Sequence, residues 1–150
     1  MIDLEVEDPA WTKALPDAGA LALATAEATL ASEGAVGEGV SLLLTDDAAL
    51  CDLNRRFRQQ DKPTNVLAFP APQNLERFLG DVALAYGVCA REASEQGKPL
   101  AHHLQHLVAH GVLHLLGYDH ETDAQAAEME DLERAVLAGL GIPDPYLAGP

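Results

Sequence analysis

Three histidines in the second half of the chain have the spacing of a metal site. They are His110, His114 and His120, with Gly117 between the second and the third. On a helix, His110 and His114 share one face, with their Cβ atoms about 5–6 Å apart. Two imidazoles at that separation can bind one ion at about 2.0–2.1 Å each. Gly117 can adopt a positive φ, end the helix and turn the chain so that His120 reaches the same ion.

The number of ligands predicts what the ion does. Three protein ligands leave one tetrahedral position open, which is typical of a catalytic zinc site and not of a structural one. We therefore expect one Zn²⁺ per chain. His106, four residues before His110, would allow a rival pair of ligands. That pair leaves Gly117 and His120 without a role, so we assign His106 a supporting or packing role beside the ligands.

The same pattern, H-x-x-x-H-x-x-G-x-x-H, is the ligand frame of the metzincin proteases. In those enzymes a glutamate follows the first histidine and serves as the general base. Gly111 occupies that position here. We therefore predict that the protein is not a metzincin-like peptidase, although the metal geometry can be shared.

The charge of the chain limits how it can bind nucleic acid. Nine Lys and Arg residues stand against 24 Asp and Glu residues, for a formal net charge of −15. Such a field repels phosphates, so any RNA contact must use a local basic patch. Four of the basic residues fall close together in the sequence: Arg55, Arg56, Arg58 and Lys62.

Length and composition predict a single domain over residues 1–150. The apolar fraction of 48% and the charged fraction of 22% are ordinary for a globular protein. No apolar run approaches the ~18–20 residues that span a bilayer. The acidic N-terminus does not look like a signal peptide, so we expect a cytoplasmic protein without membrane contact. Cys51 and Cys89 lie far apart in the sequence and are expected to be reduced, mostly buried thiols.

The apolar patterns predict the elements that must position these side chains. Alternating or short apolar runs predict strands at residues 2–7, 40–44, 66–69 and 81–85. Helical spacing and capping residues predict helices at residues 17–32, 46–57, 90–96, 100–116 and 122–140. Because strands and helices do not strictly alternate, we predict an α/β (α+β) fold with a small mixed four-stranded sheet and about five helices.

Three motifs are similar to those of the YbeY family, the bacterial endoribonucleases and ribosomal RNA maturation factors. The first is HGVLHLLGYDH at residues 110–120, the second spans residues 53–70 and includes DKPTNVLAFP, and the third is LGDV at residues 79–82. The motifs occur in the same order as in the family, and the resemblance covers essentially the whole chain. Ala68 stands where the family commonly has serine, and Phe57 where it has tyrosine. Neither departure touches the histidines.

The resemblance implies a mixed α/β fold with a metal site at the end of a cleft. It also implies cleavage of single-stranded RNA, in maturing the 3′ end of small-subunit ribosomal RNA and in ribosome quality control. The implied partners are therefore a ribosomal RNA precursor and the ribosome or its proteins. Carried over residue by residue, the metal ligands fall on His110, His114 and His120, and the family's functional arginine falls on Arg58.

The chemistry of phosphodiester cleavage agrees with a catalytic role for Arg58. Negative charge grows on the non-bridging oxygens in the transition state, where a metal ion and a guanidinium can stabilise it. Arginine presents a planar fork of donors that matches phosphate oxygens. Arg55, Arg56 and Lys62 are weaker candidates, as contacts that position the RNA backbone without reading its sequence.

The sequence leaves several alternatives open. The nucleophile is either a water activated by the metal or the RNA 2′-OH. Asp119 either supports a ligand or belongs to the turn. Two other functions keep the histidine triad: a metal-dependent hydrolase of another substrate, and a ribosome assembly factor with a structural metal. An acidic surface would suit docking on basic ribosomal proteins, but the open fourth position and the family resemblance favour an enzyme.

Overall fold

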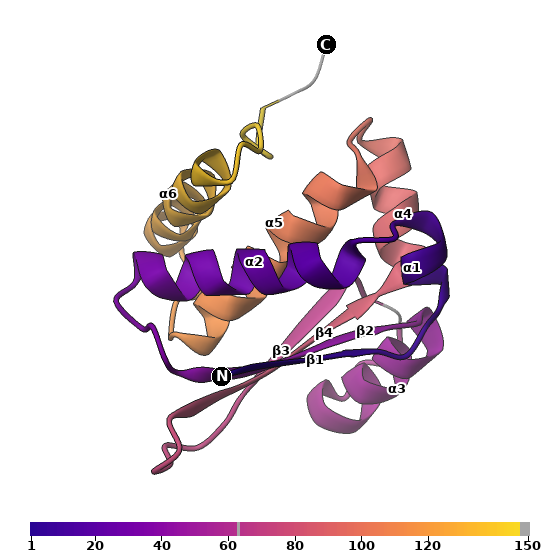
Figure 1. Cartoon of the computed structure of the whole chain (residues 1–150). Helices are drawn as coiled ribbons and strands as arrows, with labels where there is room; N and C mark the ends of the chain where they lie inside the picture. Colours follow the sequence, from indigo (N-terminus) through magenta and orange to yellow (C-terminus); the bar gives the residue numbers. More distant parts are fainter. Residues whose placement is uncertain (63, 148–150) are drawn as a thin grey trace.

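A computed structural model describes residues 1–62 and 64–147 of the chain, so Pro63 of the second motif lies outside the described residues. The described residues form four strands and six helices (Figure 1). The strands are β1 (Ile2–Val6), β2 (Gly39–Thr45), β3 (Val66–Pro70) and β4 (Phe78–Ala85). The helices are α1 (Ala10–Ala14), α2 (Ala18–Ser32), α3 (Asp47–Arg58), α4 (Tyr86–Glu95), α5 (Leu100–Leu115) and α6 (Asp123–Gly139).

The four strands form one mixed sheet in the order β1-β2-β4-β3. β1 runs parallel to β2 and β2 parallel to β4, whereas β3 runs antiparallel to β4. β1 and β3 are therefore the two edge strands of the sheet. The predicted mixed four-stranded sheet is confirmed, and β3, which leads into the hairpin to β4, leaves one edge free.

Side-chain alternation decides which face of the sheet the helices cover. In β1, Ile2, Leu4 and Val6 pack against the main core, while Asp3 and Glu5 are exposed. α2 packs on β1, and α5 packs on β3 and β4, so these two helices cover the core face (Figure 1). α3 covers part of the opposite face, and α6 forms an outer layer on α5 and α2.

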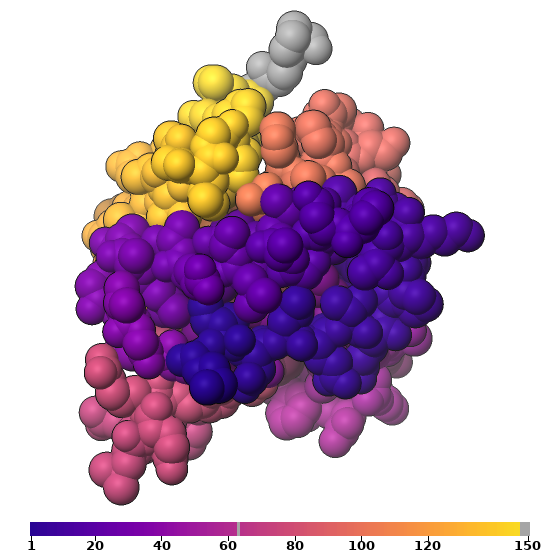
Figure 2. Space-filling model, in the orientation of Figure 1, coloured from indigo at the N-terminus to yellow at the C-terminus, as the bar shows by residue number. Residues whose placement is uncertain are grey.

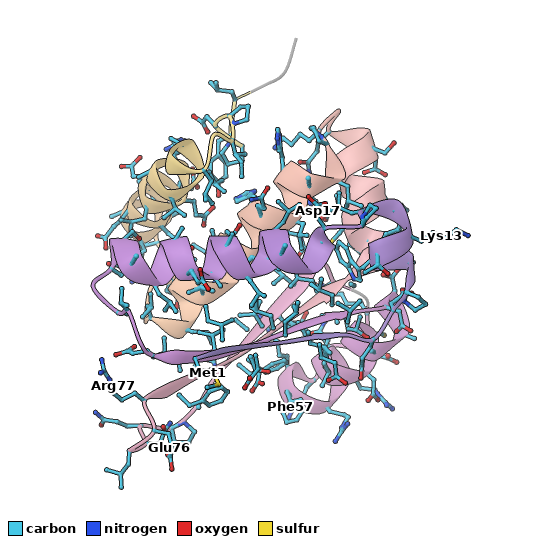
Figure 3. All side chains as sticks on the ribbon, viewed as in Figure 1. Met1, Lys13, Asp17, Phe57, Glu76 and Arg77 are labelled. Atoms are coloured by element: carbon cyan, nitrogen blue, oxygen red, sulfur yellow. The ribbon has the colours of Figure 1, made fainter. Side chains whose placement is uncertain are left out.

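The surface view shows how the chain is distributed around this core. α2 and the N-terminal strand form much of one face, and the β3–β4 hairpin extends beyond the body at the lower left (Figure 2). Lys13 of α1 and Arg77 of that hairpin project from opposite sides of the view (Figure 3). Basic side chains outside residues 55–62 are therefore dispersed over the molecule.

β4 begins at Phe78, three residues before the predicted strand, and two helices also differ from the prediction. Contacts distant in sequence explain both helices. α1 was not predicted, because five residues are too few to show a helical period. Trp11 holds this turn in place: it is fully buried, and its Nε1 donates to the Thr45 carbonyl at 3.0 Å. α4 begins earlier than predicted because Asp47 of α3 caps it, accepting from the Val88 N–H at 3.0 Å. Gly87 leaves room for that carboxylate, since a Cβ there would lie 2.4 Å from Asp47 Oδ2.

Two further predictions can be compared with the structure. Both cysteines are free thiols, as the sequence predicted; Cys89 is buried as expected, whereas Cys51 is half-buried. Within the described residues, no helix combines the length and the apolar character that a membrane crossing requires.

Candidate metal centre

α5 and the turn that follows it bring the three predicted ligands together. His110 and His114 lie in the last turns of α5. Gly117 follows with φ at +103°, a conformation that favours glycine. The Gly117 N–H donates to the His114 carbonyl at 3.0 Å, and the next N–H donates to the carbonyl before His114 at 3.1 Å. This pair of bonds closes the helix in a Schellman motif and turns the chain back, so that His120 returns to the other two histidines.

The three imidazoles form a compact group. One ring nitrogen from each lies within 4.8 Å of the others. The ring centroids of His110 and His114 are 4.8 Å apart, and those of His114 and His120 are 5.0 Å apart. His110 and His114 are half-buried, and His120 is exposed. The group is a possible three-histidine metal site, and the rival candidate His106 is not part of it.

The surroundings of two of these rings suit a metal ion. His110 donates from Nδ1 to Glu133 Oε2 at 2.8 Å, which leaves its Nε2 as the nitrogen with a free lone pair. Burial, together with the rings of His110 and His120, lowers the pKa of the His114 imidazole. Neutral imidazoles are the form that binds metal, and three of them are a ligand set that Zn²⁺ accepts. The side chains present therefore fit the predicted ion.

Glu133 is a functional candidate that the sequence prediction missed. It comes from α6, is 1% exposed, and accepts hydrogen bonds from His110, from His106 at 2.6 Å and from the Tyr146 hydroxyl. Burial opposes its charge, but these three donors outweigh burial and lower the pKa of the Glu133 carboxyl to about 2. One signal could have revealed it: Glu133 follows Met129 by four residues on the apolar face of α6, where a charged side chain needs a partner.

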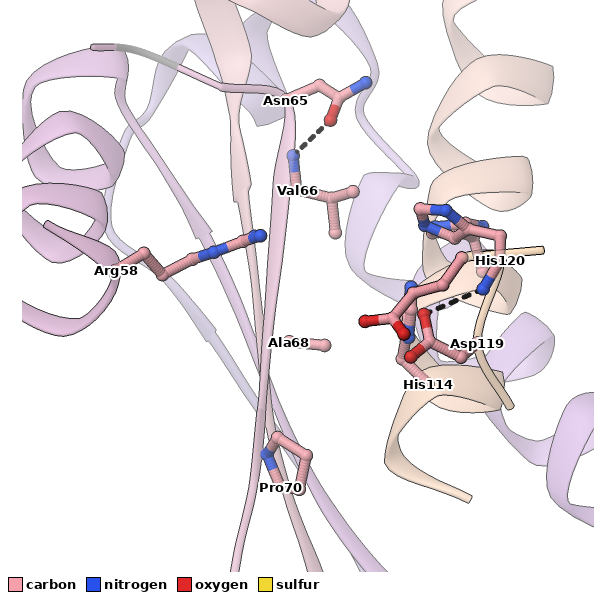
Figure 4. A pocket seen from close by; sticks show the side chains of 11 residues that line it. Arg58, Asn65, Val66, Ala68, Pro70, His114, Asp119 and His120 are labelled. Carbon is pink, nitrogen blue, oxygen red and sulfur yellow. Dashed lines mark hydrogen bonds between the residues drawn. The ribbon is translucent and has the colours of Figure 1, made fainter. Parts of the chain in front are cut away.

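The histidines open onto a cavity of about 480 Å³ that Arg58 also lines. Arg58 is the last residue of α3, and its side chain points toward β3, while His114 and His120 approach β3 from the other side (Figure 4). Ala68 and Pro70 of β3 line the cavity between them. The cavity therefore spans the free edge of the sheet, with a cation on one side and imidazoles on the other.

The other predicted cations lie outside this cavity. Arg55 and Arg56 both pair with Asp52, at 3.4 Å in the case of Arg56. Lys62 is exposed, and none of the three lines the cavity. For Arg58, in contrast, residues 1–62 and 64–147 provide no ion-pair partner. The structure thus brings Arg58 to the histidines and leaves Arg55, Arg56 and Lys62 on the surrounding surface.

Two residues of the long motif have clear local roles. Asp119 lines the cavity, and its Oδ1 accepts from the His120 N–H at 2.7 Å, so it shapes the turn that carries a ligand. Gly111 faces β4, where a Cβ would lie 2.6 Å from Val82 Cγ1. At the position of the metzincin general base, this protein therefore has a glycine that lets α5 pack closely on the sheet.

Known proteins resemble this chain over nearly its full length. A family model described as endoribonuclease YbeY matches residues 6–141. The endoribonuclease YbeY of Azorhizobium caulinodans is 55% identical over 152 residues, covering 97% of this chain and 95% of the relative. That of Paramagnetospirillum magneticum is 50% identical over 157 residues, covering 97% and 94%. The solution structure of TM1509 from Thermotoga maritima has the same fold, with a TM-score of 0.58 and 23% identity over 98% of this chain and 99% of that one.

The family model and the two relatives confirm the resemblance drawn from the motifs, and the solution structure agrees with the predicted fold class. Together with the histidine triad of α5 and the turn after it, these matches identify the chain as a member of the YbeY family of endoribonucleases.

Proposed function

We propose that the protein is a zinc-dependent endoribonuclease that cleaves single-stranded RNA. In this proposal His110, His114 and His120 hold one Zn²⁺, and Arg58 is the catalytic cation opposite. The observation that carries the proposal is the shared cavity, which the triad lines from α5 and the turn after it, and which Arg58 lines from α3. A phosphodiester in that cavity would have groups that stabilise negative charge on both sides.

The roles of the residues follow from this arrangement. The Arg58 guanidinium would bind the non-bridging oxygens of the scissile phosphate as a fork of donors. A Zn²⁺ ion on the triad would supply Lewis-acid stabilisation of the same developing charge. Asp119 holds the His120 backbone, and Glu133 holds the His110 ring. With Gly111 in the position of the metzincin base, a water and the RNA 2′-OH are the two candidate nucleophiles.

The exposure of the site favours catalysis over a structural metal. His120 is exposed and the triad opens onto a cavity, so a substrate can reach an ion held there. A closed structural site would instead be completed by a fourth protein ligand. Among the described residues, the group of side chains that could hold the ion contains three histidines and no fourth member.

We also propose where the enzyme acts. The substrate would be a ribosomal RNA precursor, cut to mature the 3′ end of the small-subunit RNA, with a further role in ribosome quality control in the cytoplasm. The net charge of −15 supports an association with basic ribosomal proteins, because the protein's overall field repels RNA. The dispersed basic residues outside positions 55–62 agree with a local RNA contact.

The test is a cleavage assay on one preparation, stripped of metal and reloaded with Zn²⁺. The substrates are a single-stranded RNA, the same RNA as a duplex, a small-subunit rRNA precursor and a peptide. We expect metal-dependent cleavage of the single strand and of the precursor near its mature 3′ end. A 2′,3′-cyclic phosphate at the new 3′ end would identify the 2′-OH as nucleophile, whereas a new 3′-hydroxyl with a 5′-phosphate would identify water.

Other outcomes would support the competing functions. Peptide cleavage without RNA cleavage would indicate a hydrolase of another substrate. Full metal loading with ribosome binding but no cleavage of any substrate would indicate an assembly factor with a structural metal.

A further inference from the structure

We propose that Glu133 is a positioning residue for the metal centre, which sets the tautomer and orientation of His110 and is itself held by Tyr146 and His106. The inference rests on the proposed function, because His110 is one of the proposed zinc ligands. It makes α6 and the segment after it, which contribute no ligand, part of the metal centre.

The first step is the contact between Glu133 and His110. Glu133 is 1% exposed, and its Oε2 accepts from His110 Nδ1 at 2.8 Å. A carboxylate can only accept, so His110 donates through Nδ1, and in the neutral ring the lone pair is then on Nε2. A ligand histidine oriented in this way is more basic and needs less reordering when the ion binds.

The second step is what holds Glu133. Its other oxygen, Oε1, accepts from His106 Nε2 at 2.6 Å and from the Tyr146 hydroxyl. The Tyr146 ring is packed edge-on against His106, with centroids 5.2 Å apart, and Arg134 lies 5.0 Å from its centroid on a face. With both oxygens engaged, the carboxylate has one orientation, which is the one that meets His110.

The third step connects Tyr146 to the rest of the fold. Arg134, next to Glu133 on α6, donates to Asp144 at 3.0 Å. The Tyr146 N–H also donates to Asp144, at 2.8 Å. These bonds fix the chain after α6 against α6 itself, so that Tyr146 reaches Glu133.

A second glutamate–histidine contact lies on α5, away from the proposed metal ligands. His103 of α5 is buried, and its Nε2 lies 2.9 Å from Glu92 Oε1. His103 does not belong to the group of side chains that could hold the ion. Glu92→Gln is therefore the control that separates loss of a Glu–His contact on α5 from loss of ligand positioning, although Glu92 is half-buried where Glu133 is buried.

The experiment measures Zn²⁺ affinity by chelator competition, without RNA, for wild type, Glu133→Gln, Tyr146→Phe, the double variant and Glu92→Gln. We expect Glu133→Gln to weaken binding by about 10–100-fold and Glu92→Gln to leave it unchanged. Tyr146→Phe should weaken it less. If Tyr146 acts through Glu133, it should add little in the Glu133→Gln background. The visible absorption bands of bound Co²⁺, which report ligand geometry, should shift in Glu133→Gln and stay unchanged in Glu92→Gln.

Imidazole NMR of the metal-free wild type is the second measurement, and it decides the matter if Glu133→Gln does not fold. We expect His110 to be protonated on Nδ1; protonation on Nε2 alone would overturn the inference. Wild-type affinity in Glu133→Gln would overturn it as well, while leaving the proposed function intact. A wild type that binds no Zn²⁺ would instead contradict the zinc dependence in the proposed function.

Discussion

At the scale of single residues, the three histidines of the triad have different surroundings. Glu133 orients His110, partial burial lowers the pKa of the His114 imidazole, and the Asp119 turn presents His120. The triad is therefore not three equivalent ligands. His114, which faces the cavity without a carboxylate partner among the hydrogen bonds described, is the position where a substitution tests metal binding most directly.

We expect His114→Ala to lose most of its bound metal. Ligand binding stabilises the native state, by about 2.7 kcal/mol when the free ion is at 100 times its dissociation constant. Zinc should therefore raise the melting temperature of the wild type and of His102→Ala, a variant of the same helix outside the triad. It should not raise that of His114→Ala. A wild type without transition metal, whose melting temperature zinc does not change, would contradict the assignment.

Arg58→Ala should retain the fold and the metal yet lose RNA cleavage. Removing one donor that stabilises transition-state charge costs about 10²–10³-fold in kcat. Arg58→Lys should restore only part of the rate, because an ammonium lacks the planar fork. Lys13→Ala, which removes one exposed positive charge from α1, is the control for net charge and should leave kcat unchanged. Full activity in Arg58→Ala would remove this residue from the mechanism.

At the scale of elements, the metal centre depends on how closely α5 packs on the sheet. Gly111 sits between the two ligands of α5, and its missing side chain lets the helix approach Val82 of β4. Gly111 also lines the cavity, so the close packing of α5 on β4 lies beside the metal centre. A glutamate at this position would have to move the helix that holds the ligands.

Gly111→Ala should destabilise the protein by about 1–3 kcal/mol in chemical denaturation, the cost of overpacking a close contact. The double variant with Val82→Ala should lose less stability than the sum of the losses in the two single variants, because the shorter side chain makes room for the new methyl. Gly139→Ala is the control: it ends α6, and a Cβ there meets no atom within 4 Å. It should be neutral or stabilising by about 0.5–1 kcal/mol. A Gly111→Ala variant as stable as wild type would show that α5 does not need this close approach.

At the scale of the whole molecule, the protein must bind RNA against its own net charge of −15. Arg55 and Arg56 are partly neutralised by Asp52, which leaves Arg58 and Lys62 as the cations of this region without a described acidic partner. Phosphate contacts must therefore be few and local, and long-range attraction should be absent.

The salt dependence of RNA binding tests this. Each contact to a single strand contributes a slope of about −0.7, so four contacts keep the magnitude below about 3. Replacing Arg55 and Arg56 together by Ala should flatten the slope and weaken all RNA sequences alike, since phosphate contacts read no bases. Lys13→Ala should leave the slope unchanged. A steep slope, or one that the Arg55/Arg56 pair does not affect, would mean that the RNA path lies elsewhere.

The integrity of the core can be followed through the two thiols. Cys89 is fully buried, and burial raises the pKa of its thiol far above the ordinary value. In the folded protein we expect an alkylating reagent to leave Cys89 intact and to modify Cys51 only slowly, with both modified after unfolding. Mass spectrometry of the products measures this. Rapid modification of Cys89 under native conditions would show that the core opens.

The histidine triad and the helix that contains two of its members could be predicted from the sequence alone. The spacing of His110 and His114 and the Gly117 turn are local features: side chains four residues apart share a helix face, and a glycine after the last turn closes the helix. Strand positions could be predicted for a related reason, because the alternation in residues 2–7 records which side chains face the core. Such features can be predicted from the sequence because the residues involved are close together in the chain.

The distant residues that meet these histidines could be identified only from the folded structure. Arg58 faces the triad because α3 and α5 pack on opposite faces of the sheet beside its β3 edge, and Glu133 reaches His110 because α6 packs on α5. Position 111 has no room for a side chain because β4 passes close to it. α4 begins where Asp47 of α3 caps it. These contacts arise from packing between elements, whose relative positions depend on the whole core and are not encoded in any local spacing.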